Sequence, residues 1–476
     1  MPAELQVYLL DPQKISPETI AVTFAKTSRS PQSFHDIAEE LTDEKSAEFH
    51  EKWVVGYGHA SVAEHAVLHI AIENLSRLAV EALESSRLAS FTEKSTRYQK
   101  WDAGSFFIPE ELDGHPLRDL YAQTCEHLFD AYLQSLEPVR AYISKASSRR
   151  EGETEAAWDR RIRSEYVDVC RFFLPAASLA NIGMTINARE LEHAICKFLT
   201  HQLAEVRALG NKLKEVAQAE VPTLVKYAHE VPYLENTAKW LSLSARQLPE
   251  ENPAGGCRLV NCDNDIENRL LAAALYRYSN NSYTQVFEAI KEMEPRQLEE
   301  LASTLVCGLG THGIPIRELE HGYFTFDIVM DQGAYAELKR HRMMTQSAQP
   351  FSPDLGFALP SLISAAGLEH VYFQAMQAAG DSYKKIAAFN PEVAAYVLPN
   401  GFNRRVLITL NLRSAYHFIR LRTAPQAHFS IRRVAGQIAE QIAARFPLLK
   451  KLPGLEPTES WQELEGRYFS STQIHI

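Results

Sequence analysis

Residues 171–207 read RFFLPAASLANIGMTINARELEHAICKFLTHQLAEVR, and residues 395–432 read AYVLPNGFNRRVLITLNLRSAYHFIRLRTAPQAHFSIR. In both stretches a Leu-Pro pair precedes an Asn-x-Arg triplet at the same interval, because 187 − 175 and 411 − 399 both equal twelve. Both stretches end with an aliphatic residue followed by arginine. A shared hydrophobic period alone would not reproduce these pairs in the same order. The sequence therefore predicts a tandem duplication, and this sets the fold.

A second pair of stretches supports the duplication: EHAVLHIAIENLSRLAVEALESSRLASFTEKSTRY (64–98) corresponds to EHGYFTFDIVMDQGAYAELKRHRMMTQSAQPFS (320–352). Their alternating runs, AVLHIAI at 66–72 and YFTFDIV at 323–329, predict half-buried strands. Residues 112–147 and 266–308 keep apolar residues three or four positions apart, which predicts helices. This mixture is typical of an α+β fold.

The composition changes between about 229 and 262, where prolines and a Gly pair interrupt any sustained period. We therefore expect a first domain at 1–240, with a helical insert near 105–165, and a second domain at 241–476. Within the insert, the charged stretch SSRREGETEAAWDRRIRSEY (147–166) is interpreted as a solvated helix or loop.

The composition excludes several classes of protein. The chain has 476 residues, 45% of them hydrophobic, and a net charge of −11, which argues against a nucleic-acid or membrane-surface partner. The N-terminal sequence has no signal-peptide pattern, and no stretch is long enough to span a membrane, so we expect a cytoplasmic protein. The cysteines show no C-x-x-C spacing and predict buried thiols rather than a zinc site or disulfides (Cys125, Cys170, Cys196, Cys257, Cys262 and Cys307).

Three short motifs carry possible chemistry. Arg340-His341-Arg342 would suit an anionic, partly aromatic ligand, although such a run at a helix end can simply stabilise the helix dipole. In FTEKSTRY (91–98), an extended chain would turn Glu93, Ser95 and Arg97 to one face, and the alternative is a polar strand edge. The third motif is the Asn-x-Arg triplet that opens a predicted helix in each half: Asn187 and Arg189 in the first, and Asn411 and Arg413, followed by His417, in the second. The alternative is that each asparagine is an ordinary N-cap.

Taken in order, and together with GHASVAEH at 58–65, these motifs resemble the signature of the flavin-dependent thymidylate synthases. The resemblance covers most of both halves, as if two copies were fused. It implies two tandem repeats of that fold, each an antiparallel sheet with helices, which form a pseudo-dimer. Because family members are homotetramers, it also implies a homodimer of fused chains, a pseudo-tetramer.

The resemblance further implies the activity. Family members bind FAD and use NADPH and methylenetetrahydrofolate to methylate dUMP, without a covalent enzyme nucleophile. An arginine helps to ionise the uracil ring, and a fixed cation there would stabilise the negative charge that develops. Its position in the second half is Arg422, the expected catalytic residue, whereas the first half has Phe198.

The two halves depart from the family pattern in complementary ways. The first half has Ser85-Ser86-Arg87 in place of Arg-His-Arg, but it keeps the Ser-x-Arg and the phosphate-binding arginine. The second half keeps Arg-His-Arg but has Pro350, Ser352 and Ala395 at the other positions. Family pockets combine these two sets from neighbouring subunits. The sequence therefore predicts one complete composite pocket and one dead pocket, with these substrate-binding residues: Glu93, Ser95, Thr96, Arg97, Arg171, Arg340 and Arg422.

Flavin-binding residues carry over by the same matching: His59, Ser61, Glu93, Asn187, Arg189, Arg340, His341, Arg342, Asn411, Arg413 and His417. Some positions differ from the family pattern, with Pro315 replacing a histidine and Thr92, Thr345 and Ser347 replacing polar residues. Glu337 replaces a substrate-contacting glutamine, which bears on the choice of pyrimidine nucleotide.

Three functions remain open from the sequence. The first is thymidylate synthesis from dUMP. The second is a catalytically altered relative that binds flavin or a pyrimidine nucleotide without making thymidylate. The third, a helical scaffold without a small-molecule ligand, is disfavoured because complementary losses spare one whole pocket.

Overall fold

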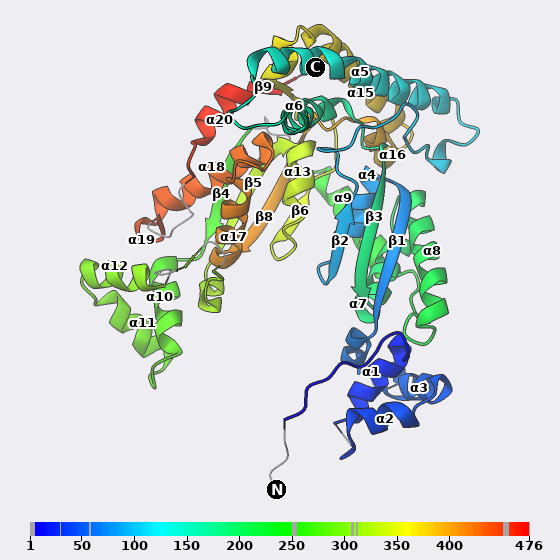
Figure 1. Ribbon diagram of the computed structural model, residues 1–476, viewed down its shortest axis with the longest axis vertical. Coiled ribbons are helices and arrows are strands. Elements are labelled where there is room, and N and C mark those ends of the chain that lie inside the picture. Colours follow the sequence, from blue (N-terminus) through cyan, green and yellow to red (C-terminus); the bar gives the residue numbers. More distant parts are fainter. Residues whose placement is uncertain are drawn as a thin grey trace. The chain divides into compact units, whose positions relative to one another are not determined.

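The computed structural model describes residues 5–28, 30–56, 59–249, 255–305, 309–310, 313–450 and 457–475. The chain forms two compact units: unit 1 comprises Met1–Lys94, Phe107–His115 and Leu179–Glu250, and unit 2 comprises Ser95–Phe106, Pro116–Ser178 and Glu251–Ile476. Both units combine helices with antiparallel strands (Figure 1), which confirms the α+β prediction. Unit 2 contains segments of both sequence copies, and the domain boundary near residue 240 stays a prediction.

Unit 1 is built on a three-stranded sheet in the order β1-β3-β2 (Val67–Ser76, Leu179–Asn187 and Ala89–Glu93). The alternating run at 66–72 forms β1, with Leu68, Ile70 and Ile72 buried on one face, so that prediction is confirmed. Helices follow the strands: α4 (Arg77–Glu84), α7 (Ala188–Leu199) and α8 (Ala204–Glu220). The N-terminal part of the unit contains α1 (Pro17–Lys26), α2 (Phe34–Glu40) and α3 (Asp43–Phe49).

Unit 2 repeats this arrangement. Its sheet has the order β4-β5-β8-β6 (Cys257–Cys262, Tyr323–Asp331, Asn403–Asn411 and Thr345–Ala348). The last three strands match β1-β3-β2, and the predicted strand at 323–329 is confirmed as β5. The registers also agree, because Val67 pairs with Asn187 in unit 1 and Tyr323 pairs with Asn411 in unit 2. The helices that follow are α13 (Gln332–Leu338), α17 (Leu412–Arg422) and α18 (Phe429–Arg445).

Both units contain a buried hydrogen bond between a hydroxyl and a carboxylate at equivalent positions, but the hydroxyl and the carboxylate have changed places. In unit 1 the hydroxyl of Ser76, the N-cap of α4, donates to Glu205 Oε2 on α8 at 2.6 Å. In unit 2 the acid is the N-cap, since Asp331 caps α13, and the hydroxyl of Ser430 on α18 donates to it. The same kind of acid–hydroxyl pair therefore joins α4 to α8 in unit 1 and α13 to α18 in unit 2.

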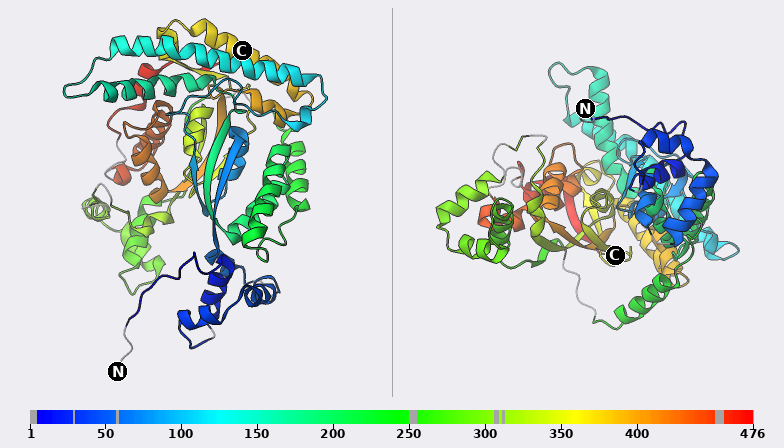
Figure 2. Two further views of the ribbon diagram at one scale, coloured as in Figure 1. Left: turned by 45° about the vertical axis from the view of Figure 1, so that its right-hand side comes forward. Right: turned by 90° about the horizontal axis from the view of Figure 1, so that it is seen from below.

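The remaining helices of unit 2 confirm the expected helical stretches within its described residues. Helix α5 (Leu117–Ala146) runs beside α15 (Glu369–Ala387), as Figure 1 and the left view of Figure 2 show. The stretch from 266 forms α10 (Ile266–Tyr276), α11 (Tyr283–Lys291) and α12 (Pro295–Thr304). The other elements are β7 (Phe357–Pro360), α14 (Ser361–Ala365), α16 (Pro391–Ala394), α19 (Pro447–Lys450), α20 (Trp461–Tyr468) and β9 (Phe469–Ile474).

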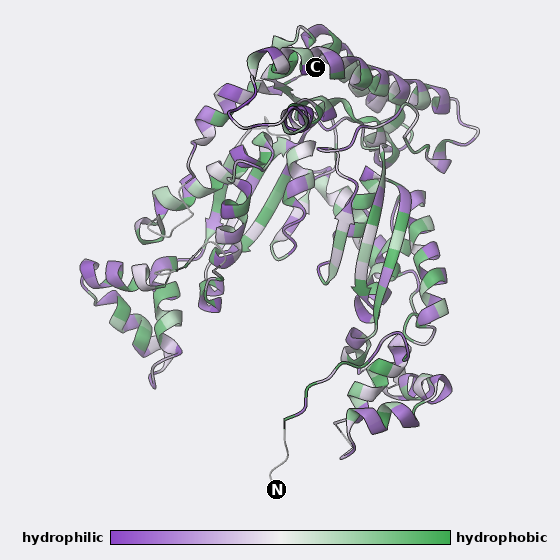
Figure 3. Ribbon diagram, viewed as in Figure 1, coloured by the Kyte–Doolittle hydropathy of each residue, from purple (hydrophilic) through white to green (hydrophobic). Residues whose placement is uncertain are grey.

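The main core of unit 2 lies between its sheet and helices α13, α17 and α18. Figure 3 shows that hydrophobic residues concentrate on strands β5 and β8, which contribute Phe324, Phe326 and Ile408 to this core. No helix within the described ranges is long and apolar enough to cross a membrane. The described cysteines are free thiols, and Cys307 lies outside the described residues.

The segment that lacks a sustained period contains one helix that the sequence did not indicate, α9 (Pro232–Ala245), which buries none of its residues and leaves Trp240 74% exposed. The charged stretch at 147–166 is a loop followed by part of α6 (Glu155–Cys170), as expected, although it buries Ile162 and Tyr166. One local prediction was wrong. The strand in FTEKSTRY ends at Glu93 and a turn follows, because the Ser95 hydroxyl accepts a hydrogen bond from the Arg97 amide at 3.2 Å.

Candidate functional site

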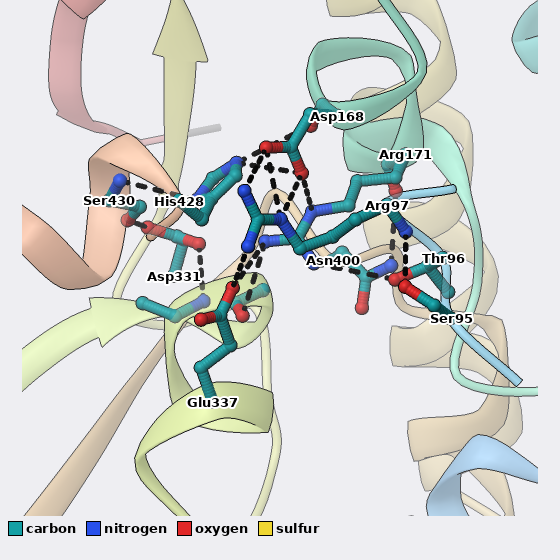
Figure 4. Close-up of polar contacts among 12 residues, drawn as sticks. Ser95, Thr96, Arg97, Asp168, Arg171, Asp331, Glu337, Asn400, His428 and Ser430 are labelled. Carbon is teal, nitrogen blue, oxygen red and sulfur yellow. Dashed lines mark hydrogen bonds and ion pairs between the residues drawn. The ribbon is translucent and has the colours of Figure 1, made fainter. Parts of the chain in front are cut away.

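Three arginines of unit 2 surround one buried carboxylate, that of Glu337 on α13. Figure 4 shows two of them, Arg97 and Arg171. Arg422, the last residue of α17, donates from Nη1 to Glu337 Oε2 at 2.7 Å. Arg97 Nη1 and Arg171 Nη2 both lie 3.8 Å from Glu337 Oε1. Two of these arginines come from the first sequence copy, whereas Arg422 and Glu337 come from the second. The chain therefore brings both copies together at one charged cluster.

The pairing of the two Leu-Pro motifs positions Arg171 in the cluster. Pro175 and Pro399, which are equivalent in the repeat, form an antiparallel bridge, and Asn400 N donates to Leu174 O at 3.0 Å. The Asn400 side chain donates to the carbonyl oxygen of Arg171 at 3.0 Å. The guanidinium of Arg171 in turn reaches the carbonyl oxygen of Gly333 on α13, at 3.4 Å.

Asp168, on the last turn of α6, pairs with both arginines of the first copy. Arg97 binds it through two nitrogens, with Nε 3.0 Å from Oδ1 and Nη2 3.0 Å from Oδ2. Arg171 Nε lies 3.4 Å from Oδ1, and Arg171 Nη1 donates to Thr96 Oγ1 at 3.3 Å. Burial raises the pKa of Asp168 above its ordinary value, and the two arginine charges oppose this effect.

His428 lies behind Asp168 and is fully buried, with its ring stacked on Phe172 at 5.9 Å. Its Nδ1 accepts from the backbone amide of Ser430 at 3.2 Å, so Nε2 carries the proton and donates to the carbonyl oxygen of Asp168 at 3.4 Å. Burial, and then the charges of Arg171 and Arg97, hold the pKa of His428 well below its ordinary value. The ring is therefore a neutral support for the cluster.

The Arg-His-Arg run follows the end of α13 and reaches the cluster through His341. Its Nε2 accepts a hydrogen bond from Arg422 Nε at 2.9 Å, and its ring meets Phe418 edge-on at 4.9 Å. Burial, together with the charge of Arg422, lowers the pKa of His341 to about 3. Burial also lowers the pKa of Arg422, against the opposing charge of Glu337. Neutral His341 thus orients Arg422 without adding charge.

The Asn-x-Arg motifs are N-caps, as the simpler interpretation held. Asn187 accepts from the amide of Glu190 at 2.9 Å, and Asn411 accepts from that of Ser414 at 2.8 Å. The arginine of each motif also makes an equivalent ion pair in both copies, with the glutamate of Glu64-His65 in the first and of Glu320-His321 in the second. Arg413 donates to Glu320 at 2.6 Å, and Arg189 donates to Glu64.

Three further predicted site residues, Glu93, His59 and Ser61, belong to unit 1. Glu93 is buried in an ion pair with Arg77 at 2.6 Å. His59 precedes the short helix at Ala60–His65 and Ser61 lies in it, both with exposed side chains. Phe198, at the repeat position of Arg422, is fully buried in the core of unit 1.

Sequence reasoning missed four polar residues of the cluster: Asp168, Asp331, Asn400 and His428. One of them had a readable signal, because Asp168 precedes Arg171 by three residues at the end of a helix, a spacing that pairs opposite charges. The other three, Asp331, Asn400 and His428, become neighbours of Arg171 or Asp168 only because the two copies pair in the tertiary structure.

A flavin nucleotide fits the second-copy side of the cluster by the chemistry of its side chains. Arg340 and His417 are exposed there, Met343 is 74% exposed, and the His341 and His417 rings lie 5.8 Å apart. Cations and flat rings together suit a ligand that carries both phosphates and an aromatic ring system.

Comparisons with known proteins identify the family of this chain. The thymidylate synthase complementing protein family matches residues 10–223 and 258–448. A UPF0159 protein of Chlamydia muridarum is 30% identical over 430 residues, covering 86% of this chain and 81% of the relative. A flavin-dependent thymidylate synthase of Clostridium tetani is 30% identical over 221 residues, covering 45% of this chain and 82% of the relative. The crystal structure of a UMP/dUMP methylase from Streptomyces cacaoi, bound with 5-Br dUMP, aligns with 44% of this chain and 100% of its own at 18% identity and a TM-score of 0.35.

Proposed function

Because the chain belongs to the thymidylate synthase complementing protein family, we propose that it methylates dUMP to dTMP, with FAD as cofactor and NADPH and methylenetetrahydrofolate as co-substrates. Membership of this family marks it as a flavin-dependent enzyme. The observation that carries the proposal is the convergence of Arg97 and Arg171 from one copy and Arg422 from the other on Glu337. A composite pocket needs this convergence.

The residues divide between the two ends of the nucleotide. Arg97 and Arg171, with Ser95 and Thr96 beside them, bind the phosphate, since fixed guanidinium groups and hydroxyls are its usual partners. Arg422, beside Arg340, lies along the pyrimidine ring and stabilises the negative charge that forms when C5 becomes nucleophilic. His341 fixes the orientation of Arg422.

The reaction needs no enzyme nucleophile. The methylene carbon of the folate would form a bond to C5 of the pyrimidine, and the C5 proton leaves. The carbon–nitrogen bond to the folate then breaks and releases tetrahydrofolate, and one hydride equivalent from NADPH reduces the transferred carbon to a methyl group. A bound flavin supplies the carrier for these electrons, and Arg340, His341, Arg342 and His417 would hold it on the second-copy side. Arg413 would belong to the same flavin site of unit 2, and the predicted flavin contacts of unit 1 are His59, Ser61 and Arg189.

The antiparallel bridge between Pro175 and Pro399 supports a pseudo-dimer, because equivalent residues pair in this way across a two-fold axis. We infer that two chains assemble as a pseudo-tetramer with one working pocket each. In unit 1, Phe198 stands where the family has the ring-ionising arginine, and a buried phenylalanine cannot ionise a uracil ring.

One observation favours the second candidate, a relative that binds the nucleotide without making thymidylate. Glu337 and Asp168 balance two of the three arginine charges, and this weakens a site for a phosphate dianion.

A conversion assay separates the two candidates. The purified protein should be yellow, should oxidise NADPH faster when dUMP is added, and should release dTMP when methylenetetrahydrofolate is present. UMP and dCMP tested in parallel would identify the preferred base and sugar. A flavin-loaded protein that binds dUMP but forms no methylated product would exclude thymidylate synthesis and leave the second candidate.

A further inference from the structure

The sheet of unit 2 has one strand more than the sheet of unit 1, at its outer edge. Strand β4 pairs there with β5, whereas β1, the strand equivalent to β5, pairs only with β3 among the described strands. The outer side of β1 therefore has no strand beside it in the described part of the chain. An uncovered edge of this kind readily accepts another strand, because its backbone groups can pair with it.

The N-terminal segment, residues 5–10, has a sequence that matches the additional strand. Residues 5–11 read LQVYLLD, and residues 257–263, which begin with β4, read CRLVNCD. In β4, three side chains pack on the core of unit 2 (Cys257, Leu259 and Cys262). The matching positions of the N-terminal segment are all apolar (Leu5, Val7 and Leu10). The segment therefore has the apolar face that a strand at this edge needs.

The helix that follows each of these segments is also equivalent. Helix α10 follows β4 and packs on the short helix Arg317–His321, which comes just before β5. Helix α1 follows the N-terminal segment and packs on the short helix Ala60–His65, which comes just before β1. A strand that precedes α1 therefore belongs at the outer edge of a β1 strand, as β4 lies at the outer edge of β5.

In its own chain the N-terminal segment does not occupy this edge. Val7 is 88% exposed and Leu9 is 95% exposed. Asp11 closes a turn directly after the segment, since its carbonyl oxygen accepts from the amides of Lys14 and Ile15 at 3.1 and 3.2 Å. From this turn the segment leads away from β1 (Figure 1). A single chain thus leaves both the edge and the matching strand open.

We propose that residues 5–10 of one chain bind as a fourth strand along the outer edge of β1 in a second copy of this chain. Exchange in both directions closes a two-fold dimer in which each copy covers the β1 edge of the other. The pairing of β4 with β5 sets the register, because Arg258 faces Asp327 there. By the repeat, Gln6 then faces Ala71 of the second copy, since Val67 and Tyr323 are equivalent positions.

Disulfide trapping tests the exchange at two residues with exposed side chains. One full-length chain carries Gln6→Cys, a second chain with a different tag carries Ala71→Cys, and the two are co-expressed and mildly oxidised. We expect a disulfide between the two chains, because facing residues of antiparallel strands have Cα atoms about 4.5–5.5 Å apart, within the range of a disulfide. Ser90→Cys, an exposed position on the other edge strand, β2, is the matched control for Ala71→Cys. It should give no more linked dimer than the wild-type chain.

Sedimentation equilibrium gives an independent measurement. Val7→Asp places a charge on the side of the segment that would face the core of the second copy, so it should raise the Kd of the two-chain assembly at least about tenfold. Leu248→Asp changes another exposed apolar residue of unit 1, outside the segment, and should leave this Kd unchanged. Because Val7 is exposed within its own chain, its replacement should not impair folding.

Three results would overturn the exchange. A chain that carries both Gln6→Cys and Ala71→Cys and forms only an internal disulfide would show that the segment folds back onto its own β1. Absence of any linked product above the Ser90→Cys level would show that the segment does not reach this edge. Equal Kd values for Val7→Asp and Leu248→Asp would show that it does not hold the two chains together. None of these results bears on the proposed nucleotide pocket, because the residues changed belong to unit 1.

Discussion

One residue position differs between the copies in both charge and burial: it is Arg422 in unit 2 and Phe198 in unit 1. Both residues lie at or near the C-terminal end of equivalent helices, α17 and α7. Phe198 is packed into the core, whereas Arg422 is held by Glu337 and His341. The same fold therefore supports a structural residue in one copy and a candidate catalytic residue in the other.

Replacing Arg422 with alanine should weaken dUMP binding about 10- to 150-fold, which corresponds to the loss of one charge-assisted hydrogen bond of about 1.5–3 kcal/mol. Fluorescence or calorimetric titration of the flavin-loaded variant measures this. Arg296→Ala removes an exposed arginine on α12 and is the charge-matched control. An unchanged Kd for Arg422→Ala would exclude this arginine from the nucleotide site.

Acidification should destabilise the protein through His341. Its pKa is about 3 in the folded chain and about 6.5 in the unfolded chain, so the unfolded state binds more protons between these values. The free energy of unfolding should therefore fall as the pH drops below about 6.5, by up to about 1.4 kcal/mol per pH unit from this group, and should not change above that pH.

Urea denaturation at pH 7, 5.5 and 4 tests this, with His341→Asn expected to show a shallower loss than wild type. The exposed His35→Asn variant is the control, since its side chain is 68% exposed. Identical pH profiles for all three proteins would show that His341 is not held neutral.

At the scale of elements, the sequence predicted those parts that local patterns determine. Alternation located β1 and β5, and the repeated motifs located the equivalent helices, because burial on one face dictates the period. Helix α9 was missed because none of its residues is buried, so it shows no amphipathic period. The turn at Ser95 was missed because a side-chain hydrogen bond ends the strand, and Ser-Thr-Arg has no strong turn signature.

The acid–hydroxyl pair that joins α4 to α8 and α13 to α18 gives a prediction at this scale. Ser430→Ala should lower the free energy of unfolding by about 1–3 kcal/mol, because the buried carboxylate of Asp331 loses a donor. The double variant Asp331→Ser/Ser430→Glu copies the arrangement of Ser76 and Glu205 and should recover part of this loss. A double-mutant cycle in urea measures the coupling, and strictly additive effects would show that the two residues do not interact.

At the scale of the whole molecule, the complementary losses in the two copies are enough to predict a shared pocket. Arg97, Arg171 and Arg422 do meet around Glu337, since the Leu-Pro motifs pair the copies. Residues such as Asn400 and His428 could not be predicted in this role, because only tertiary pairing makes them neighbours of the arginines.

Assembly offers a separate prediction. If each chain stands for two family subunits, sedimentation equilibrium should give a mass of two chains, near twice 53.7 kDa. A stable monomer that retains flavin would contradict the pseudo-tetramer, while leaving the composite pocket within one chain untouched.

The central claim is that the fused chain has one working nucleotide pocket, built from both copies. Calorimetric titration of the flavin-loaded protein with dUMP tests it most directly through the binding stoichiometry. We predict one dUMP per chain in wild type, and a Kd at that site that is about 10- to 150-fold higher in Arg422→Ala. Two equivalent sites per chain, or one site whose Kd is unchanged in Arg422→Ala, would contradict the account.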